Sequence, residues 1–345
     1  MEIVGVIHGH STYSDGHGTA AQVAAAAASA GLDFLVMTDH DTLQPLAEVG
    51  EAFHGRTLLL WGCEVSPPTN HLLAVGASTC PSCQQPPQAY LDELRAQGAL
   101  TFLAHPHDRG VRLARVPSYR WDSWPIEGYT GIEVWNQLSD WGGRLTGLGS
   151  TLRALQRPAQ ALRGPEPETL QLWDQAGLQR RVVGIGGLDV HDIHVGHPPL
   201  GVRIFPYAYA FRTIRCHVRV EAWPEAPKDA KAELLQALQE GRLHFADDEL
   251  ADSRGIAWSA LDGNGAVRGG MGDELACRSV QALRLSAPRP ALLTLVKDGV
   301  PIMRGEGREL SAPTQGPGVY RAELRIPGRG RDLPWAYTNP IYLRG

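Results

Sequence analysis

Residues 2–10 read EIVGVIHGH, an apolar run rich in β-branched residues that ends on His8 and His10. Such a run predicts a short buried β-strand. Side chains two residues apart on an extended chain point to the same side, so both imidazoles can reach one ion where the strand ends. Alone the pair is a weak signal, because short motifs of this kind often arise by coincidence.

The same pattern continues to about residue 201. Apolar runs of strand length alternate with longer segments of helical composition, which is typical of an α/β domain with a mostly parallel sheet. We predict strands at 3–7, 34–38, 58–62, 72–76, 100–104, 131–135 and 182–185, and this number of strands suits a barrel better than a small open sheet. We predict helices at 20–30, 87–97, 169–175 and 228–240, each followed within two residues by a glycine that favours a helix C-terminus.

The pattern of apolar and turn residues in the sequence changes after about Asp247. Short alternating stretches at 282–286, 292–296 and 319–326 are separated by turn signals such as Asp298-Gly299, a pattern of β-hairpins. The sequence therefore predicts two domains. Residues 1–247 form an α/β barrel, and residues 248–345 form a small β-sandwich-like domain that stabilises the protein or promotes oligomerisation.

The composition excludes several classes of protein. The 345 residues are 20% charged and 43% hydrophobic, an ordinary globular balance. Acids outnumber bases 37 to 32, which does not favour a surface for nucleic acid or an anionic membrane. The five cysteines are too sparse for a disulfide framework and indicate a reducing compartment. Without a visible secretory signal or a long apolar run, we expect a soluble cytoplasmic protein of undetermined oligomeric state.

Residues that can bind metal lie at the ends of the predicted strands. His71 comes just before the fourth strand, and the others follow a strand. The carboxyl ends of strands in α/β barrels and parallel sheets meet at one edge. Several strands therefore place imidazole or carboxylate groups at the same end of the barrel. This donor set contains no thiolate and suits Zn, Mn or Fe(II). The residues at these positions are His8, His10, Asp39, His40, Asp41, Glu64, His71, His105, His107, Asp189 and His191.

The donor set indicates a polynuclear hydrolytic site. A carboxylate such as Glu64 can bridge two ions, which typically lie about 3.5–4 Å apart. Two divalent ions lower the pKa of a shared water towards neutrality, giving a hydroxide that can attack a phosphorus ester in line. The expected substrate is a small phosphoester.

Further residues are candidates for handling the substrate. His107 is a candidate for proton transfer to the leaving group, and Arg109, His194 and Asn136 are candidates for binding the substrate. For His107, Arg109 and His194, a solvent-exposed or supporting side chain is an equally good interpretation. Asp39, at the end of the second strand, is expected to orient an imidazole rather than to act as an acid.

Taken in order, these stretches resemble the PHP (polymerase and histidinol phosphatase) family of metal-dependent phosphoesterases. The stretches that match are HGHSTYSDG (8–16), GLDFLVMTDHDT (31–42), GCEV (62–65), HLLAVG (71–76), AHP (104–106) and GLDVHD (187–192). The resemblance implies a distorted seven-stranded (β/α) barrel with two or three divalent ions. It also implies three ligand sets: His8, His10, Glu64 and Asp189; Glu64, His71 and His105; and Asp15, His40 and His191.

A looser resemblance concerns the end of the chain. Residues 337–342, YTNPIY, look like the tail of a PHP subgroup related to carbaryl hydrolase, which carries a β-rich C-terminal domain. That subgroup and the aromatic-rich insertion at 112–129 leave open a hydrolase of a non-phosphate ester, for instance an aryl carbamate. The insertion is interpreted either as an aromatic lid or as rings that pack it onto the barrel. A nuclease is less favoured, and a metal-binding module without turnover is a further alternative.

Overall fold

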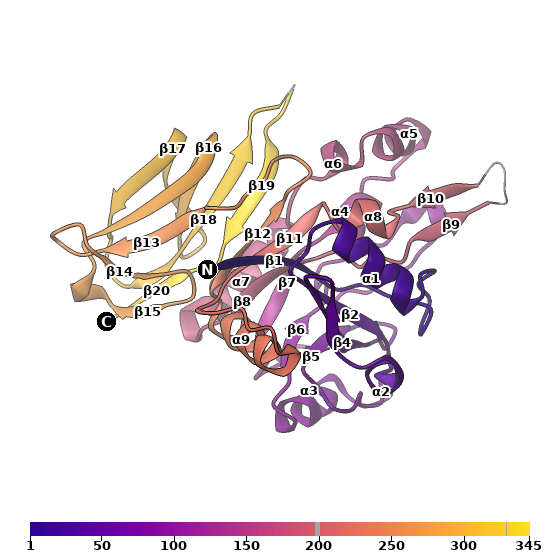
Figure 1. Cartoon of the computed structure of the whole chain (residues 1–345). Coiled ribbons are helices and arrows are strands. Elements are labelled where there is room, and N and C mark those ends of the chain that lie inside the picture. The colour runs from indigo at the N-terminus through magenta and orange to yellow at the C-terminus, as the bar shows by residue number, and fades with distance from the viewer. Residues whose placement is uncertain (197–200, 329) are drawn as a thin grey trace.

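The computed structural model describes residues 1–196, 201–328 and 330–345. His197, for which the sequence favours a loop, lies outside these residues. The chain forms a mixed α/β fold around one large sheet of 18 strands, with β9 and β10 as a separate two-stranded ribbon among the described residues. Figure 1 shows the elements from β13 to β20 gathered on one side of the molecule and most of the earlier elements on the other.

Strands form at all seven positions predicted in the first 201 residues of the chain. β2 pairs in parallel with β1 and with β4, β5 lies antiparallel between β4 and β6, and β6, β7 and β8 are parallel. The end of β8 returns to β1 through a bridge between Gly9 and Val190. The strands are β1 (Glu2–Ile7), β2 (Phe34–His40), β4 (Thr57–Val65), β5 (Leu72–Val75), β6 (Leu100–Leu103), β7 (Gly131–Asn136) and β8 (Val183–Gly187).

These strands carry nearly continuous apolar runs because both of their faces are buried. Every residue of β4, β5, β6, β7 and β8 is buried, as expected for strands covered on both sides. Large side chains such as Phe34, Trp61 and Phe102 are fully enclosed. Each such residue contributes about 1.5–3 kcal/mol through the apolar surface it removes from water.

The predicted helices are confirmed, with one difference in length. The first begins at a capping box between Thr19 and Gln22, and the last ends at Gly241 in the left-handed conformation. The third continues through Gly177, where we expected it to stop. A side chain at this position would come within 3.2 Å of Val319, so this glycine serves close packing. These helices are α1 (Ala20–Ser29), α3 (Pro87–Ala96), α7 (Pro167–Gln179) and α9 (Pro227–Glu240).

Several shorter elements were not predicted. They lie mainly in the connections between the longer strands, where sequence periodicity is weak. The helices are α2 (Gln44–Glu48), α4 (Gln137–Gly142), α5 (Leu148–Gln156), α6 (Pro158–Ala161) and α8 (Tyr207–Ala210), and the strands are β3 (Ala52–His54), β9 (Ile193–Val195), β10 (Val202–Ile204), β11 (Ile214–Arg219) and β12 (Leu243–Asp247). In the part of the chain that is described, no helix has both the length and the apolar character needed to cross a membrane.

The C-terminal strands continue the same sheet, because β11 pairs with β1, β12 with β11, and β19 with β12. The stretches at 282–286 and 292–296 belong to a single strand, interrupted by a shift of register between Ser286 and Ala291. Asp298 and Gly299, both with positive φ, form its hairpin turn. The strands are β13 (Ala257–Leu261), β14 (Val267–Gly270), β15 (Glu274–Ala276), β16 (Ala282–Lys297), β17 (Val300–Pro313), β18 (Gly318–Ile326), β19 (Leu333–Thr338) and β20 (Ile341–Arg344).

The buried apolar residues form two clusters. One extends from Ile3 to Phe245 and includes Tyr337, and the other extends from Ala246 to Leu343. The change from one cluster to the other falls near residue 247, where the pattern of apolar and turn residues in the sequence changes. The boundary between two domains at this residue stays a prediction.

A buried ion pair joins α7 to β18. The guanidinium of Arg321 donates to both carboxylate oxygens of Asp174, at 2.7 and 2.8 Å, and both side chains are almost fully buried. Breaking such a pair leaves an uncompensated charge in the interior.

We expect Arg321→Met to lower the free energy of unfolding by about 3–5 kcal/mol, because Asp174 stays buried without its partner. The matched control is Arg344→Met, which removes a more exposed pair with Glu274 and should cost about 0–1 kcal/mol. Urea unfolding measures both variants. Equal losses in the two would contradict the assignment.

Asp247, at the end of β12, carries a buried carboxyl group that accepts few hydrogen bonds. Its Oδ2 atom has no hydrogen-bond partner among the described residues. Burial raises its pKa from 3.8 to about 8. The folded protein therefore keeps this proton between about pH 4 and pH 8, where the unfolded chain loses it.

Because the unfolded state binds fewer protons in this range, the free energy of unfolding should fall as the pH rises from 4 to 8. Asp247→Asn cannot ionise and should remove that part of the fall, so the variant gains stability over wild type towards pH 8. Urea unfolding at pH 5, 6, 7 and 8 measures the difference. The exposed control Asp332→Asn should follow wild type, and equal pH slopes for all three proteins would disprove the expectation.

Candidate metal centre

The structure brings all the predicted metal ligands into one cluster of three overlapping groups. Within each group, one donor atom of every residue lies within 4.8 Å of the others. The groups match the three sets that the resemblance implies, except that His10 also joins the third. They are His8, His10, Glu64 and Asp189; Glu64, His71 and His105; and His10, Asp15, His40 and His191.

The strands deliver these residues by leaving the extended conformation as they end. His8, His105 and Asp189 have positive φ angles of 71°, 28° and 56°, which cost of order 1–3 kcal/mol each and persist only where surrounding structure holds them. The Asp189 amide donates to the His8 carbonyl at 2.9 Å. The His105 amide donates to a carboxylate oxygen of Glu133 at 2.8 Å. These bonds keep the bent strand ends in place.

The first group has the spacing of a four-coordinate metal site. The Nε2 atoms of His8 and His10 both lie 3.4 Å from Oε2 of Glu64, and 3.3 and 3.2 Å from Oδ1 of Asp189. Bonds of about 2.0–2.2 Å to a tetrahedral ion place its donor atoms about 3.3–3.6 Å apart. Both Nε2 atoms and this Glu64 oxygen are buried without a hydrogen-bond partner among the described residues. The donors therefore fit a divalent ion.

Glu64 connects the first group to the second. Its Oε2 atom faces the first group, while its Oε1 atom lies 2.9 Å from Nδ1 of His71 and 3.2 Å from Nε2 of His105. One carboxylate thus presents an oxygen to each group. This arrangement suits a carboxylate that bridges two ions.

The third group lies at the open side of the cluster. Oδ1 of Asp15 lies 3.1 Å from Nε2 of His191 and 3.6 Å from Nε2 of His40. The Asp15 side chain is 61% exposed, whereas Glu64 is fully buried. Solvent can therefore reach the cluster from this side.

Protons balance the charges of the cluster when it holds no ion. Although burial alone would raise the pKa values of Glu64 and Asp189, the surrounding histidines hold both well below their usual range. Burial alone would lower the pKa of His40 and of His105, but the nearby Glu64 carboxylate raises each to about 9. Metal ions must displace these protons, so metal affinity should increase with pH.

Glu133 on β7 supports this cluster, although the sequence analysis did not identify it. It is fully buried, and its Oε1 atom lies 2.7 Å from Nδ1 of His8. That contact turns Nε2 of His8 towards the first group, as carboxylates commonly do for metal-binding histidines. A signal was available, since this glutamate interrupts an otherwise apolar run at 131–135.

The structure gives the Asp39 carboxylate other partners than the imidazole that we expected. Its carboxylate is buried and accepts hydrogen bonds from the amide and hydroxyl of Ser11 and from the hydroxyl of Ser14. It holds the loop that follows His10 and touches no imidazole in these contacts. Ser66 has the position expected for such a partner, with its hydroxyl 2.6 Å from Nδ1 of His40.

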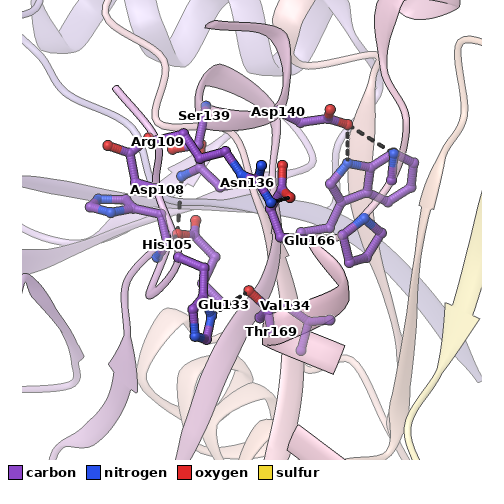
Figure 2. A pocket seen from close by; sticks show the side chains of 14 residues that line it. His105, Asp108, Arg109, Glu133, Val134, Asn136, Ser139, Asp140, Glu166 and Thr169 are labelled. Carbon is purple, nitrogen blue, oxygen red and sulfur yellow. Dashed lines mark hydrogen bonds and ion pairs between the residues drawn. The ribbon is translucent and has the colours of Figure 1, made fainter. Parts of the chain in front are cut away.

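Three of the four candidates for handling the substrate, His107, Arg109 and Asn136, line a small cavity of about 30 Å³ beside β7. Figure 2 shows Asn136, Arg109 and Glu133 around it. Asn136 donates to Glu133 at 3.0 Å and accepts from the Ser139 amide at 2.8 Å, so the protein engages both ends of its amide. The predicted contact of Asn136 with substrate is therefore not supported by these bonds.

The remaining candidate substrate residues also contact other side chains of the same chain. Arg109 pairs with Glu166 at 2.6 Å, and Nδ1 of His107 lies 2.9 Å from the Thr169 hydroxyl. His194 is half-exposed and stacks on His17. These contacts point the three side chains at neighbours outside the ligand cluster. Their roles towards substrate stay predictions.

A much larger cavity of about 780 Å³ opens directly onto the cluster. Tyr119 of the 112–129 insertion lines it, with its ring 5.0 Å from that of His71. Trp121 is instead buried, and its indole donates to the His71 carbonyl at 2.8 Å. The insertion thus combines both interpretations, with one ring at the mouth and one ring packed beneath it.

A further group of possible donors, Glu2, His217 and His244, lies away from this cluster. Nδ1 of His217 is 2.9 Å from Glu2, and its Nε2 atom is 3.0 Å from Asp248. Burial alone would lower the pKa of His217, but these two partners raise it. A buried imidazolium between two carboxylates accounts for the group.

The chain matches no protein-family model and no curated protein sequence. Among solved structures it is similar to a two-domain protein from Bacteroides vulgatus that contains a predicted PHP-like metal-dependent phosphoesterase, with 17% identity, a TM-score of 0.45, and 99% of this chain and 95% of that one covered.

Two further structures are more distant, and each covers 54% of this chain and 87% of its own. A proposed metal-dependent phosphoesterase from Bifidobacterium adolescentis has 16% identity and a TM-score of 0.29. An amidohydrolase from Chromobacterium violaceum, with bound sulfate and no metal, has 16% identity and a TM-score of 0.28.

The contact between Glu133 and His8 leads to a prediction. We expect Glu133→Gln to weaken metal binding by about 10–100-fold while the number of ions bound at saturation stays the same, because the residue orients a ligand without being one. Chelator competition and elemental analysis measure the two quantities. Glu306→Gln, an exposed change on β17, is the control. Unchanged affinity, or the loss of an ion at saturation, would contradict this role.

Proposed function

We propose that this protein is a metal-dependent hydrolase of the PHP type that cleaves a small phosphomonoester or phosphodiester. Residues 1–247 would form the distorted seven-stranded barrel and residues 248–345 the β-rich C-terminal domain. The observation that carries the proposal is the convergence of nine imidazole and carboxylate ligands into three groups, with Glu64 shared by two of them. Two or three ions of Zn, Mn or Fe suit these donors.

Divalent ions held there would supply Lewis-acid charge for the attacking water and for the oxygens of the ester. The residues of the chain do the positioning. Glu64 offers one oxygen to each of two groups, and Glu133 fixes His8 from behind. Asp15, on the exposed side, leaves room for the substrate to enter.

The proton that the leaving group needs must come from a group near the open side. His107 is our candidate from the sequence, and it lies half-buried on the smaller cavity. Burial lowers its pKa, so it is neutral at pH 7 and better suited to accept a proton than to donate one.

A second candidate function is hydrolysis of a non-phosphate ester such as an aryl carbamate. The observation that favours it is the apolar wall of the large cavity, which includes Val111, Leu138 and Trp141. A nuclease is less well supported, because the formal net charge of −5 does not attract a polyanion.

Activity and its dependence on metal test the proposal. We expect the Mn²⁺-loaded protein to hydrolyse p-nitrophenyl phosphate or its bis ester, a chelator to abolish turnover, and added metal to restore it. Glu64→Gln should lower kcat/KM by at least about 100-fold, since the bridging carboxylate is lost. Glu306→Gln is again the control.

Two results would change the proposal. Equal turnover by Glu64→Gln and wild type, or failure to bind metal, would refute it. Hydrolysis of an aryl N-methylcarbamate far faster than either phosphate would select the second candidate.

A further inference from the structure

The cavity of about 780 Å³ is lined by residues of the ligand cluster and by a wall of apolar side chains. Three segments build this wall, and they follow three neighbouring strands, β6, β7 and β8. They meet over the cluster because the carboxyl ends of those strands meet there. Two residues from each segment are Val111 and Val116, Leu138 and Trp141, and Ile193 and Val195.

Part of this wall is apolar surface left open to solvent. Val116 is 42% exposed and Val195 is 52% exposed. A single exposed valine needs no explanation. Here, however, both line one cavity that continues into the ligand cluster, which is the usual form of a small-molecule site.

The charge of the cavity restricts what can occupy it. Among the described residues that line it, histidines aside, the formally charged side chains are carboxylates, including Asp15, Asp41 and Asp108. Asp108 is held near the wall by bonds from the amides of Gly110 and Tyr119 to its Oδ2 atom. A second anionic group on the substrate, away from bound cations, would meet like charge.

The volume is also larger than a phosphate needs. Cavities of about 300–1,000 Å³ enclose most of a drug-sized molecule. The ligand cluster and the apolar wall both line this one cavity.

We infer that the cavity binds an uncharged, apolar portion of an ester substrate whose scissile group lies at the ligand cluster. This inference rests on the proposed function and extends it to the class of substrate. The apolar portion lies against Val116 and Val195 and removes their exposed surface from water. Each buried methylene then strengthens binding by a few-fold.

Binding of a neutral apolar probe tests the cavity without any turnover. N-phenyl-1-naphthylamine should bind the metal-free protein with an increase in fluorescence. Val116→Ser combined with Val195→Ser should weaken binding by about five- to tenfold. The matched control combines Val49→Ser and Val300→Ser, which change two exposed valines outside the cavity lining, and it should bind like wild type.

Turnover of three phosphodiesters tests the substrate class. Methyl, hexyl and 5-carboxypentyl p-nitrophenyl phosphate share one leaving group and differ only in the second substituent. The hexyl ester should have a kcat/KM at least about tenfold above that of the methyl ester. The carboxypentyl ester should lose this gain, and so should the hexyl ester with the Val116→Ser/Val195→Ser variant.

The results separate this inference from the proposed function. Equal kcat/KM for the methyl and hexyl esters in an active enzyme would overturn the inference alone. The inference would also be overturned if the probe did not bind, or if it bound the Val116→Ser/Val195→Ser variant as tightly as wild type. Probe binding that depends on the valines, in a protein that hydrolyses no ester, would support the apolar site and refute the proposed function.

Discussion

The structure of the site depends on one buried carboxylate, that of Glu64. Its side chain is completely enclosed, and its two oxygens face imidazoles on different sides. A buried carboxylate without partners is costly, so the surrounding histidines must either share protons with it or hold cations beside it. The same requirement explains the lowered pKa of Glu64 and the raised pKa values of His40 and His105.

The strands and turns of the fold place the histidines around Glu64. β1, β4, β6 and β8 bring ligands to one edge, and the left-handed turns at His8, His105 and Asp189 aim them inward. Glu133 stabilises two of these ligands at once, since it contacts the His8 ring and the His105 amide. A strained strand end is tolerated because a second buried carboxylate holds it.

Much of this centre was predictable from the sequence, because local spacing encodes it. The pairs 8 and 10, and 189 and 191, follow apolar runs, and strand polarity carries them to a common edge. The long-range partners were not predictable in the same way. Asp39 stands next to His40 but contacts Ser11 and Ser14, and Arg109 turns to Glu166, more than 50 residues away in the chain.

The sequence by itself predicted the strand pattern and most donors of the candidate metal centre, since these depend on side chains two residues apart and on apolar runs of strand length. Asp15 and the division into three ligand sets came from the resemblance to the PHP family. Only the tertiary structure decided that Glu133 orients His8, that Asn136 is engaged by Glu133 and Ser139, and that an apolar cavity adjoins the cluster. The physical reason is that these features join segments separated by tens of residues. Their contacts are set by how the loops pack, and no local period in the chain records that packing.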